Sequence, residues 1–237
     1  MIVELSVQIH SMGVFLPVNG KVENFKARKL IPDRKSIKLM TRSVQLGVAA
    51  ASVALRSTDV WQAISPSRRG IFVSAAPCLD DHFDLQSALR AAHQDGQFSL
   101  KRFATDGMSL IHPLWLVRGL SNNILGFTSS MWDFQGENMN YCQGHIGGKH
   151  AFIQAAKAIE EGRLECALVG GADVLTGAEE IYQKECAEAA VFFVIGPSES
   201  SMKIDLEHVQ DLVNSQPVMG AAGWLAALHR SLETASI

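Results

Sequence analysis

Apolar and polar residues alternate from Gly136 to Cys142, the two-residue period of a half-buried strand. The apolar positions that follow change to helical spacing, at Phe152, Ile153, Ala156 and Ile159. Gly162 is placed to end that helix, and ECALVGGADV then forms a continuous apolar run typical of a buried strand. The stretch from Gly136 to Val174 therefore predicts a strand, a tight turn, a buried helix and a second strand.

The turn in this unit is where we expect chemistry. Gly144, Gly147 and Gly148 crowd the junction between strand and helix. Free N–H groups and the positive end of the helix dipole at such a junction would lower the pKa of a thiol or stabilise an oxyanion. Strand-to-helix elbows of this kind present nucleophiles in many enzymes.

The remaining pattern predicts alternating strands and helices. An opening strand or pair of strands through Gly13 is expected over Ile2–Leu16, and another short buried strand over Gly70–Ala75. A third apolar strand is expected over Ala189–Gly196. Helical spacing recurs in five further stretches: Leu39–Leu55, Asp84–Ala92, His112–Trp132, Gly177–Ala187 and, as two helices, Asp205–Ile237.

Composition narrows the function class. The chain has 237 residues, 47% hydrophobic and 19% charged, which is sufficient for a large α/β domain with a real core. A net charge of −3 and a pI near 6.2 argue against nucleic-acid binding, and we interpret the short basic run Arg28–Lys38 as solvated surface. No apolar segment approaches a membrane span, so we expect a cytoplasmic protein without a membrane partner. The four cysteines lack metal-ligand spacing, and no cofactor is expected.

Several motifs resemble, in order and spacing, those of the β-ketoacyl synthases of the thiolase superfamily. The resemblance is carried by the first long helix with its Arg, Gln and alanine-rich run (RSVQLGVAAASVAL), the Asn and Gly before the nucleophile strand, and the GGAD and GAAG turns. It covers residues 1 to about 196 and again from about 215 to the end. It implies an α/β, thiolase-like layered α-β-α fold, with one half-domain of about five strands and covering helices plus a remnant of the second half.

The resemblance also sets the domain expectation. Residues 1–196 would be the thiolase-like half-domain and residues 197–237 a C-terminal helical remnant of the second half. The polar segment Gly196–Met202, GPSESSM, is predicted to be a hinge between them.

Aligning this sequence with the family's motifs also indicates which residues occupy the family's functional positions. Counting without a gap from Gly162 and Gly170, the nucleophile position is His145, and Cys142 lies three residues too early. The family's second-half Lys and His positions are Leu212 and Pro217, and the HGTGT loop that carries another family histidine has no counterpart. Since condensation needs a thiolate and imidazole donors, the resemblance implies a degenerate site with no catalytic residues of its own.

The leading hypothesis is therefore a non-catalytic subunit similar to a chain-length factor. It would pair with a catalytic β-ketoacyl synthase subunit in type II polyketide or fatty-acid-like biosynthesis, with an acyl carrier protein as a further candidate partner. The resemblance implies a partner interface along the nucleophile strand, namely Asn138, Met139, Asn140, Tyr141, Cys142 and Gln143. It also implies a tunnel wall formed by Trp115, Leu116 and Leu120.

Three alternatives stay open. Cys142, His145 and His150 could form a separate acyl-transferring or hydrolytic site, although a strand residue and a turn residue three positions apart do not normally face each other. His145 could act as an oxyanion donor in a decarboxylase that primes synthesis. The chain could also be a stand-alone binding or scaffold protein.

Overall fold

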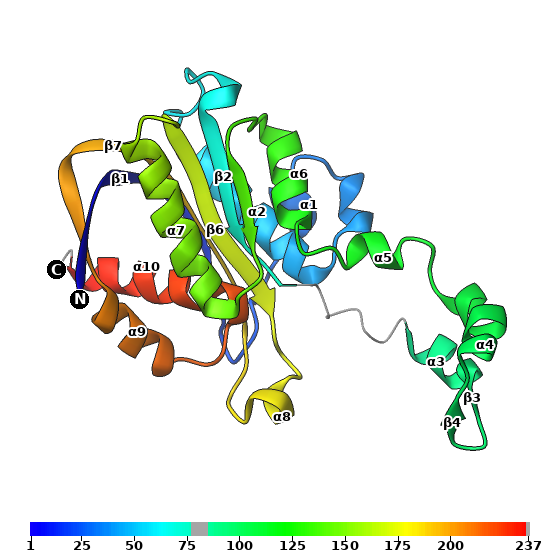
Figure 1. The fold of residues 1–237 in the computed structure, drawn as a ribbon. Helices are drawn as coiled ribbons and strands as arrows, with labels where there is room; N and C mark the ends of the chain where they lie inside the picture. The colour runs from blue at the N-terminus through cyan, green and yellow to red at the C-terminus, as the bar shows by residue number, and fades with distance from the viewer. Residues whose placement is uncertain (77–84, 236–237) are drawn as a thin grey trace.

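A mixed five-stranded sheet forms the centre of the molecule, in a computed structural model that describes residues 1–76 and 85–235. The strand order is β1-β7-β6-β2-β5 (Figure 1), with β2 parallel to both β5 and β6, and β7 antiparallel to β1 and β6. The strands are β1 (Ile2–Phe15), β2 (Arg69–Ser74), β5 (Asn138–Tyr141), β6 (Cys166–Val174) and β7 (Glu188–Asp205). The predicted half-domain of about five strands is confirmed.

Helices cover both faces of this sheet. Helices α2 (Arg42–Arg56) and α6 (Asn123–Trp132) lie on one face, and α7 (Gly144–Glu160) and α10 (Gly223–Ala235) lie on the other (Figure 1). Helix α9 (Leu206–Asn214) packs against α10. Within the described ranges, no helix is both long and apolar enough to cross a membrane.

The two faces have separate hydrophobic cores because side chains alternate along each strand. In β7, Phe192 and Val194 contribute to the core beneath α2, whereas Val191 and Phe193 contribute to the core beneath α7 and α10. A strand buried on both faces must be apolar throughout, which explains the unbroken run AAVFFVI.

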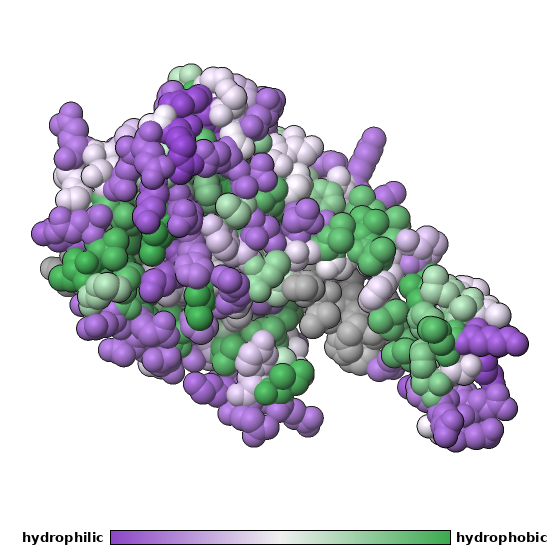
Figure 2. Space-filling view, viewed as in Figure 1, coloured by the Kyte–Doolittle hydropathy of each residue, from purple (hydrophilic) through white to green (hydrophobic). Residues whose placement is uncertain are grey.

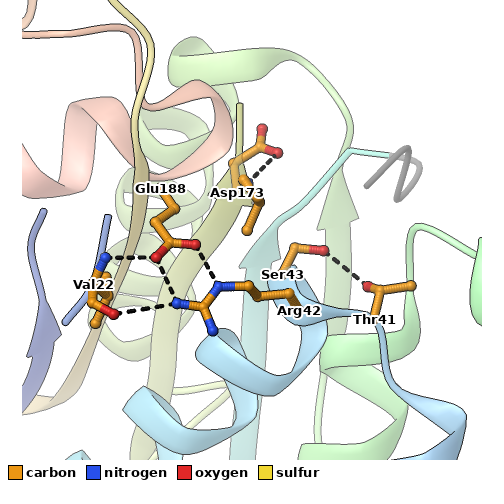
Figure 3. Close-up of polar contacts among 7 residues, drawn as sticks. Val22, Thr41, Arg42, Ser43, Asp173 and Glu188 are labelled. Carbon is orange, nitrogen blue, oxygen red and sulfur yellow. Dashed lines mark hydrogen bonds and ion pairs between the residues drawn. The ribbon is translucent and has the colours of Figure 1, made fainter. Parts of the chain in front are cut away.

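A buried ion pair joins the start of β7 to α2 and to the loop after β1 (Figure 3). The side chain of Glu188 is 1% exposed, and each of its oxygens accepts a hydrogen bond from Arg42, Nε–Oε2 and Nη2–Oε1, both at 2.6 Å. The backbone N–H of Val22 donates to Oε1 at 2.5 Å, and Arg42 returns a bond to the Val22 carbonyl at 3.2 Å. The carboxylate therefore fixes three segments that are far apart in the sequence.

The predicted hinge at Gly196–Met202 is wrong. This segment lies within β7, where Pro197 pairs with Val7 and Met202 pairs with Leu5. Proline and serines are tolerated because β7 no longer pairs with β6 beyond Ile195. Residues on both sides of position 196 also share one core, in which Trp224 of α10 contacts Phe152 of α7 at a ring distance of 6.2 Å.

Other boundaries also differ from the sequence expectation. The predicted helix Gly177–Ala187 shrinks to the single turn α8 (Glu179–Tyr182), between Gly177 and Gln183 in left-handed conformations. The stretch His112–Trp132 forms two helices, α5 (Trp115–Arg118) and α6. The helix expected over Leu39–Leu55 starts at Arg42. Of the two forms expected over Ile2–Leu16, the structure has the single strand β1.

A segment between β2 and α6 extends away from the sheet (Figure 1). It contains α3 (Gln86–Ala92), the hairpin β3 (His93–Gln94) and β4 (Gln97–Phe98), and α4 (Leu100–Arg102). Helix α3 matches the helix predicted over Asp84–Ala92, except that Asp84 lies outside the described residues. The short helix α1 (Ala27–Leu30) lies between β1 and α2 in the sequence and packs on α2.

Candidate functional site

The elbow between β5 and α7 is a tight turn, as the sequence predicts. Strand β5 ends at Tyr141, and α7 begins at Gly144, whose φ of +55° favours glycine. The hydroxyl of Ser74, at the end of β2, donates to the Gly144 carbonyl at 3.3 Å. Within residues 1–76 and 85–235, no side-chain cap hydrogen bond is made to the N-terminus of α7, whose N-cap residue is Gln143.

A cavity of about 340 Å³ opens beside this elbow. Gly144 and His145 line one side, and the segment joining α9 to α10, including Pro217, lines another. The two positions that the resemblance assigns to the nucleophile and the second-half histidine therefore meet at one cavity. Leu212, at the lysine position, is not among the lining residues and packs partly buried against the core.

His145 is partly buried and lines this cavity. Burial lowers the pKa of its imidazole below the usual value, because a charged ring would lose hydration there. The ring is therefore neutral at pH 7. It can donate or accept a hydrogen bond, but it cannot replace a thiolate as the carrier of an acyl chain.

Cys142 lies outside the cavity lining, and its side chain is exposed. Its sulfur accepts a hydrogen bond from Asn140 Nδ2 at 3.2 Å. His150 is held elsewhere, with its Nδ1 2.9 Å from Oε1 of Gln143. Among the described residues, the thiol thus has an amide rather than a histidine as its hydrogen-bond partner, an arrangement that does not generate an activated nucleophile.

The GGAD and GAAG turns contact each other directly. Asp173 Oδ2 accepts a hydrogen bond from the Ala221 N–H at 3.0 Å, and Oδ1 accepts one from the Val174 N–H at 2.9 Å. Gly220 has a φ of +45°, and a Cβ there would lie 2.0 Å from Asp173 Oδ2. Sequence reasoning used both motifs only as landmarks. The contact between them holds the α9–α10 segment against the elbow.

The proposed interface residues lie at or just beyond one edge of the sheet. Among the described strands β5 pairs with β2 alone, so its other side presents backbone groups that no described strand pairs with. Asn138 and Met139 are exposed, whereas Asn140 and Tyr141 are partly buried. Cys142 and Gln143 follow the end of the strand.

The proposed tunnel-wall residues lie on the surface, away from the cavity. Trp115 is partly buried, whereas Leu116 and Leu120 are 69% and 45% exposed. Figure 2 shows apolar surface over α5 and on the extended segment beside it, and the exposed apolar side chains there include Leu114, Leu116, Val117, Leu100 and Met108. Apolar exposure on this scale is typical of an interaction surface.

A family model describing the N-terminal domain of the β-ketoacyl synthases matches residues 12–192. The chain belongs to the β-ketoacyl synthase family. This match includes the elbow, the GGAD turn and the strands β2, β5 and β6, but only the last part of β1 and the first part of β7. A comparison with curated protein sequences found no significant match.

Solved structures with the same fold include several ketosynthases. One is named AntDE:AntF, a type II PKS acyl-carrier protein in complex with its ketosynthase (18% identity, TM-score 0.65, covering 81% of this chain and 62% of that one). Another is the ishigamide ketosynthase/chain length factor (17% identity, TM-score 0.56, 76% and 49%). A third is a β-ketoacyl synthase from Burkholderia phymatum STM815 (16% identity, TM-score 0.58, 82% and 60%). The chain thus spans about half to three fifths of the length of these structures.

Four polar residues that sequence reasoning missed also line the cavity. Tyr182, Lys184, Asn214 and Gln216 all line it, and none belongs to a motif that the sequence singles out. In residues 1–76 and 85–235, no group of three His, Cys, Asp or Glu side chains is placed to hold a metal ion.

Proposed function

We propose that this chain is a non-catalytic subunit that pairs with a catalytic β-ketoacyl synthase and helps to shape its acyl tunnel, as a chain-length factor does. The observation that carries the proposal is His145 at the elbow where the family places its cysteine. Pro217 and Leu212 stand at the positions of the second-half histidine and lysine. Decarboxylative condensation requires a thiolate and hydrogen-bond donors for the developing enolate. This site has neither a cysteine nor such donors at the matching positions.

The partner is proposed to bind along β5 and over α5. An open strand edge with apolar side chains nearby tends to pair with another chain, and the exposed Met139 on β5 fits that role. One similar structure is a ketosynthase/chain length factor, and another contains a ketosynthase with an acyl carrier protein. By analogy, the partners of this chain would be a ketosynthase subunit and, at the assembled site, an acyl carrier protein. Residues 197–237 would then be a remnant of the second half.

Co-expression with a candidate ketosynthase tests this assembly. We expect the chain to aggregate or express poorly alone and to purify as a heterodimer with its partner, because burying the β5 edge stabilises the folded subunit. Met139→Asp should weaken the heterodimer at least about tenfold, since a charge would be buried at an interface centre. Size-exclusion chromatography with mass measurement gives the stoichiometry.

The matched control for this experiment is Met12→Asp, on the opposite edge strand β1, where Met12 is 37% exposed. This variant should leave the heterodimer intact. A monodisperse wild-type monomer at micromolar concentration that ignores the ketosynthase would contradict the proposal.

Trp115→Ala tests the contribution to the tunnel. We expect longer products from the reconstituted complex, because removing a ring from the end of a close-packed tunnel makes room for further carbons. Trp115 is only partly buried in the subunit, so the stability cost should be smaller than the roughly 3–5 kcal/mol typical of a fully buried ring. The measurement is the product-length distribution on a common primer and extender.

Ile2→Ala serves as the control for Trp115→Ala, because Ile2 is 62% exposed at the start of β1 and does not belong to the apolar surface over α5. Its product distribution should equal that of the wild type. Unchanged products from an intact Trp115→Ala complex would show that the catalytic partner alone sets chain length.

A further inference from the structure

Residues 21–38, between β1 and α2, carry a concentration of positive charge that the proposed subunit role does not use. They contain seven Lys and Arg residues and two acidic ones, a net charge of +5 in a chain whose net charge is −3, so the other residues together carry −8. The seven cations are all exposed: Lys21, Lys26, Arg28, Lys29, Arg34, Lys35 and Lys38. None of their side chains forms an ion pair or a hydrogen bond within the described parts of the chain.

The segment is held in place because its apolar side chains pack inward. Val22 and Ile31 are buried in the core beneath α2, and Phe25 and Leu30 pack against that core. The one-turn helix α1 contacts α2, and Arg42 of α2 donates a hydrogen bond to the Val22 carbonyl at 3.2 Å. One side of the segment therefore faces the core, and the cations occupy its outer side.

An apolar residue lies beside the first of these cations. Asn19 and Gly20, with φ of +50° and +81°, form a two-residue turn in which Val18 and Lys21 exchange backbone hydrogen bonds at 2.8 and 3.1 Å. Residues paired in this way present their side chains on the same face. Val18 is 54% exposed, so an apolar side chain and an ammonium group project together from this turn. A layer of lipid headgroups offers contacts to both.

The composition of this surface favours a lipid layer over a protein or a nucleic acid. Five of the seven cations are lysines, which are depleted at protein interfaces, and residues 19–59 expose no large apolar side chain to form an interface centre. Bases of single strands stack on exposed aromatic rings, whereas Phe25 packs against the Arg42 guanidinium, 5.5 Å from its ring centre. Anionic headgroups need only an array of cations, each contributing about a fivefold gain in binding.

We propose that residues 18–38 bind the anionic surface of a lipid bilayer, with the seven cations at the headgroups and Val18 among them. The net charge of −8 on the other residues orients the molecule, because a negative surface repels them while it attracts this segment. Peripheral contact of this kind needs no membrane-spanning helix. It does not depend on the subunit role proposed above, since the segment follows β1, the opposite edge strand of the sheet from β5.

Co-sedimentation of the full chain with lipid vesicles, in whichever assembly it purifies, tests the proposal. Vesicles of phosphatidylcholine with about 30% phosphatidylserine should bind it at least about tenfold more tightly than vesicles of phosphatidylcholine alone. Raising the ionic strength from about 0.1 M to about 1 M should remove most of this difference, because the screening length falls from about 10 Å to about 3 Å.

Two double variants of equal charge locate the contact. Lys29→Gln/Lys35→Gln removes two of the seven cations and should weaken binding to the anionic vesicles by roughly tenfold to thirtyfold. Lys101→Gln/Lys157→Gln removes two exposed lysines from other parts of the surface and should weaken it by less than about threefold. Thermal unfolding of each variant verifies that it is folded.

Three outcomes would overturn the proposal. The first is equal binding of folded wild-type protein to anionic and neutral vesicles at an ionic strength of about 0.1 M. The second is the same loss in both double variants, which would mean that overall charge rather than this segment is recognised. The third is binding of polyglutamate or of a DNA duplex, at matched total charge, as tightly as the anionic vesicles, which would make an acidic protein or a nucleic acid the occupant.

Discussion

In a reconstituted complex with a catalytic ketosynthase, His145→Ala and Cys142→Ser are each expected to leave the condensation rate within about twofold of the wild type. The reason is that neither residue is placed to carry an acyl chain. His145 is a neutral imidazole at the position that the resemblance assigns to the nucleophile. Cys142 is exposed, accepts a hydrogen bond from Asn140 and lies outside the cavity lining. The measurement is the steady-state rate of product formation, with the assembly verified by mass.

Replacing the nucleophilic cysteine of the catalytic partner provides the contrast. That change should lower the rate by at least about 100-fold, since all acyl transfer would pass through the partner. A comparable loss on His145→Ala or Cys142→Ser, in an intact complex, would instead place an active site in this chain. Loss on Cys142→Ser would favour an acyl-transferring site, and loss on His145→Ala alone would favour a priming decarboxylase.

The largest effect on stability is expected from Glu188→Ala. This substitution removes both hydrogen bonds to Arg42 and leaves the Val22 N–H without its acceptor. Removing one partner of a buried ion pair costs about 3–5 kcal/mol, and the lower end applies here because the Arg42 side chain is 43% exposed and can regain water. Urea unfolding should show a fall of about 3 kcal/mol in the free energy of unfolding.

Glu165→Ala is the matched control for Glu188→Ala. Glu165 forms an ion pair with Arg68 at 3.0 Å, but the two side chains are 54% and 38% exposed. Exposed pairs contribute about 0–1 kcal/mol, so this variant should unfold close to the wild type. Equal losses in the two variants would mean that Glu188 does not fix the loop after β1 to β7 and α2.

The local pattern of the sequence was sufficient to predict the elbow and the sheet. Alternation up to Cys142, helical spacing after Gly148 and the apolar run from Cys166 each depend on neighbours a few residues apart, and the structure has β5, α7 and β6 there. Glycine landmarks also gave a register in which His145 and Pro217 meet at one cavity. The sequence therefore indicated which two residues to look for at the candidate site.

The local sequence pattern gave a wrong prediction of secondary structure where pairing with a distant strand outweighs local composition. GPSESSM has the polarity of a linker, yet it continues β7 because β1 is long enough to pair with it. Over Gly177–Ala187 the helical spacing predicts a full helix, but the structure has a single turn there. Residues with positive φ at both ends, Gly177 and Gln183, limit it. Backbone pairing with a distant strand is invisible to a window of neighbouring residues.

Sequence alone determined the family and the succession of the main strands and helices along the chain, because these depend on short motifs and their spacing. Only the tertiary structure decided which polar groups meet. Arg42 and Glu188 are 146 positions apart, and Asp173 and Ala221 are 48 apart, so no periodicity links them. The same applies to Lys184 and Gln216, which reach the cavity from separate segments. Contacts of this kind arise only when the chain closes on itself, since they depend on the positions of elements rather than on their own residues.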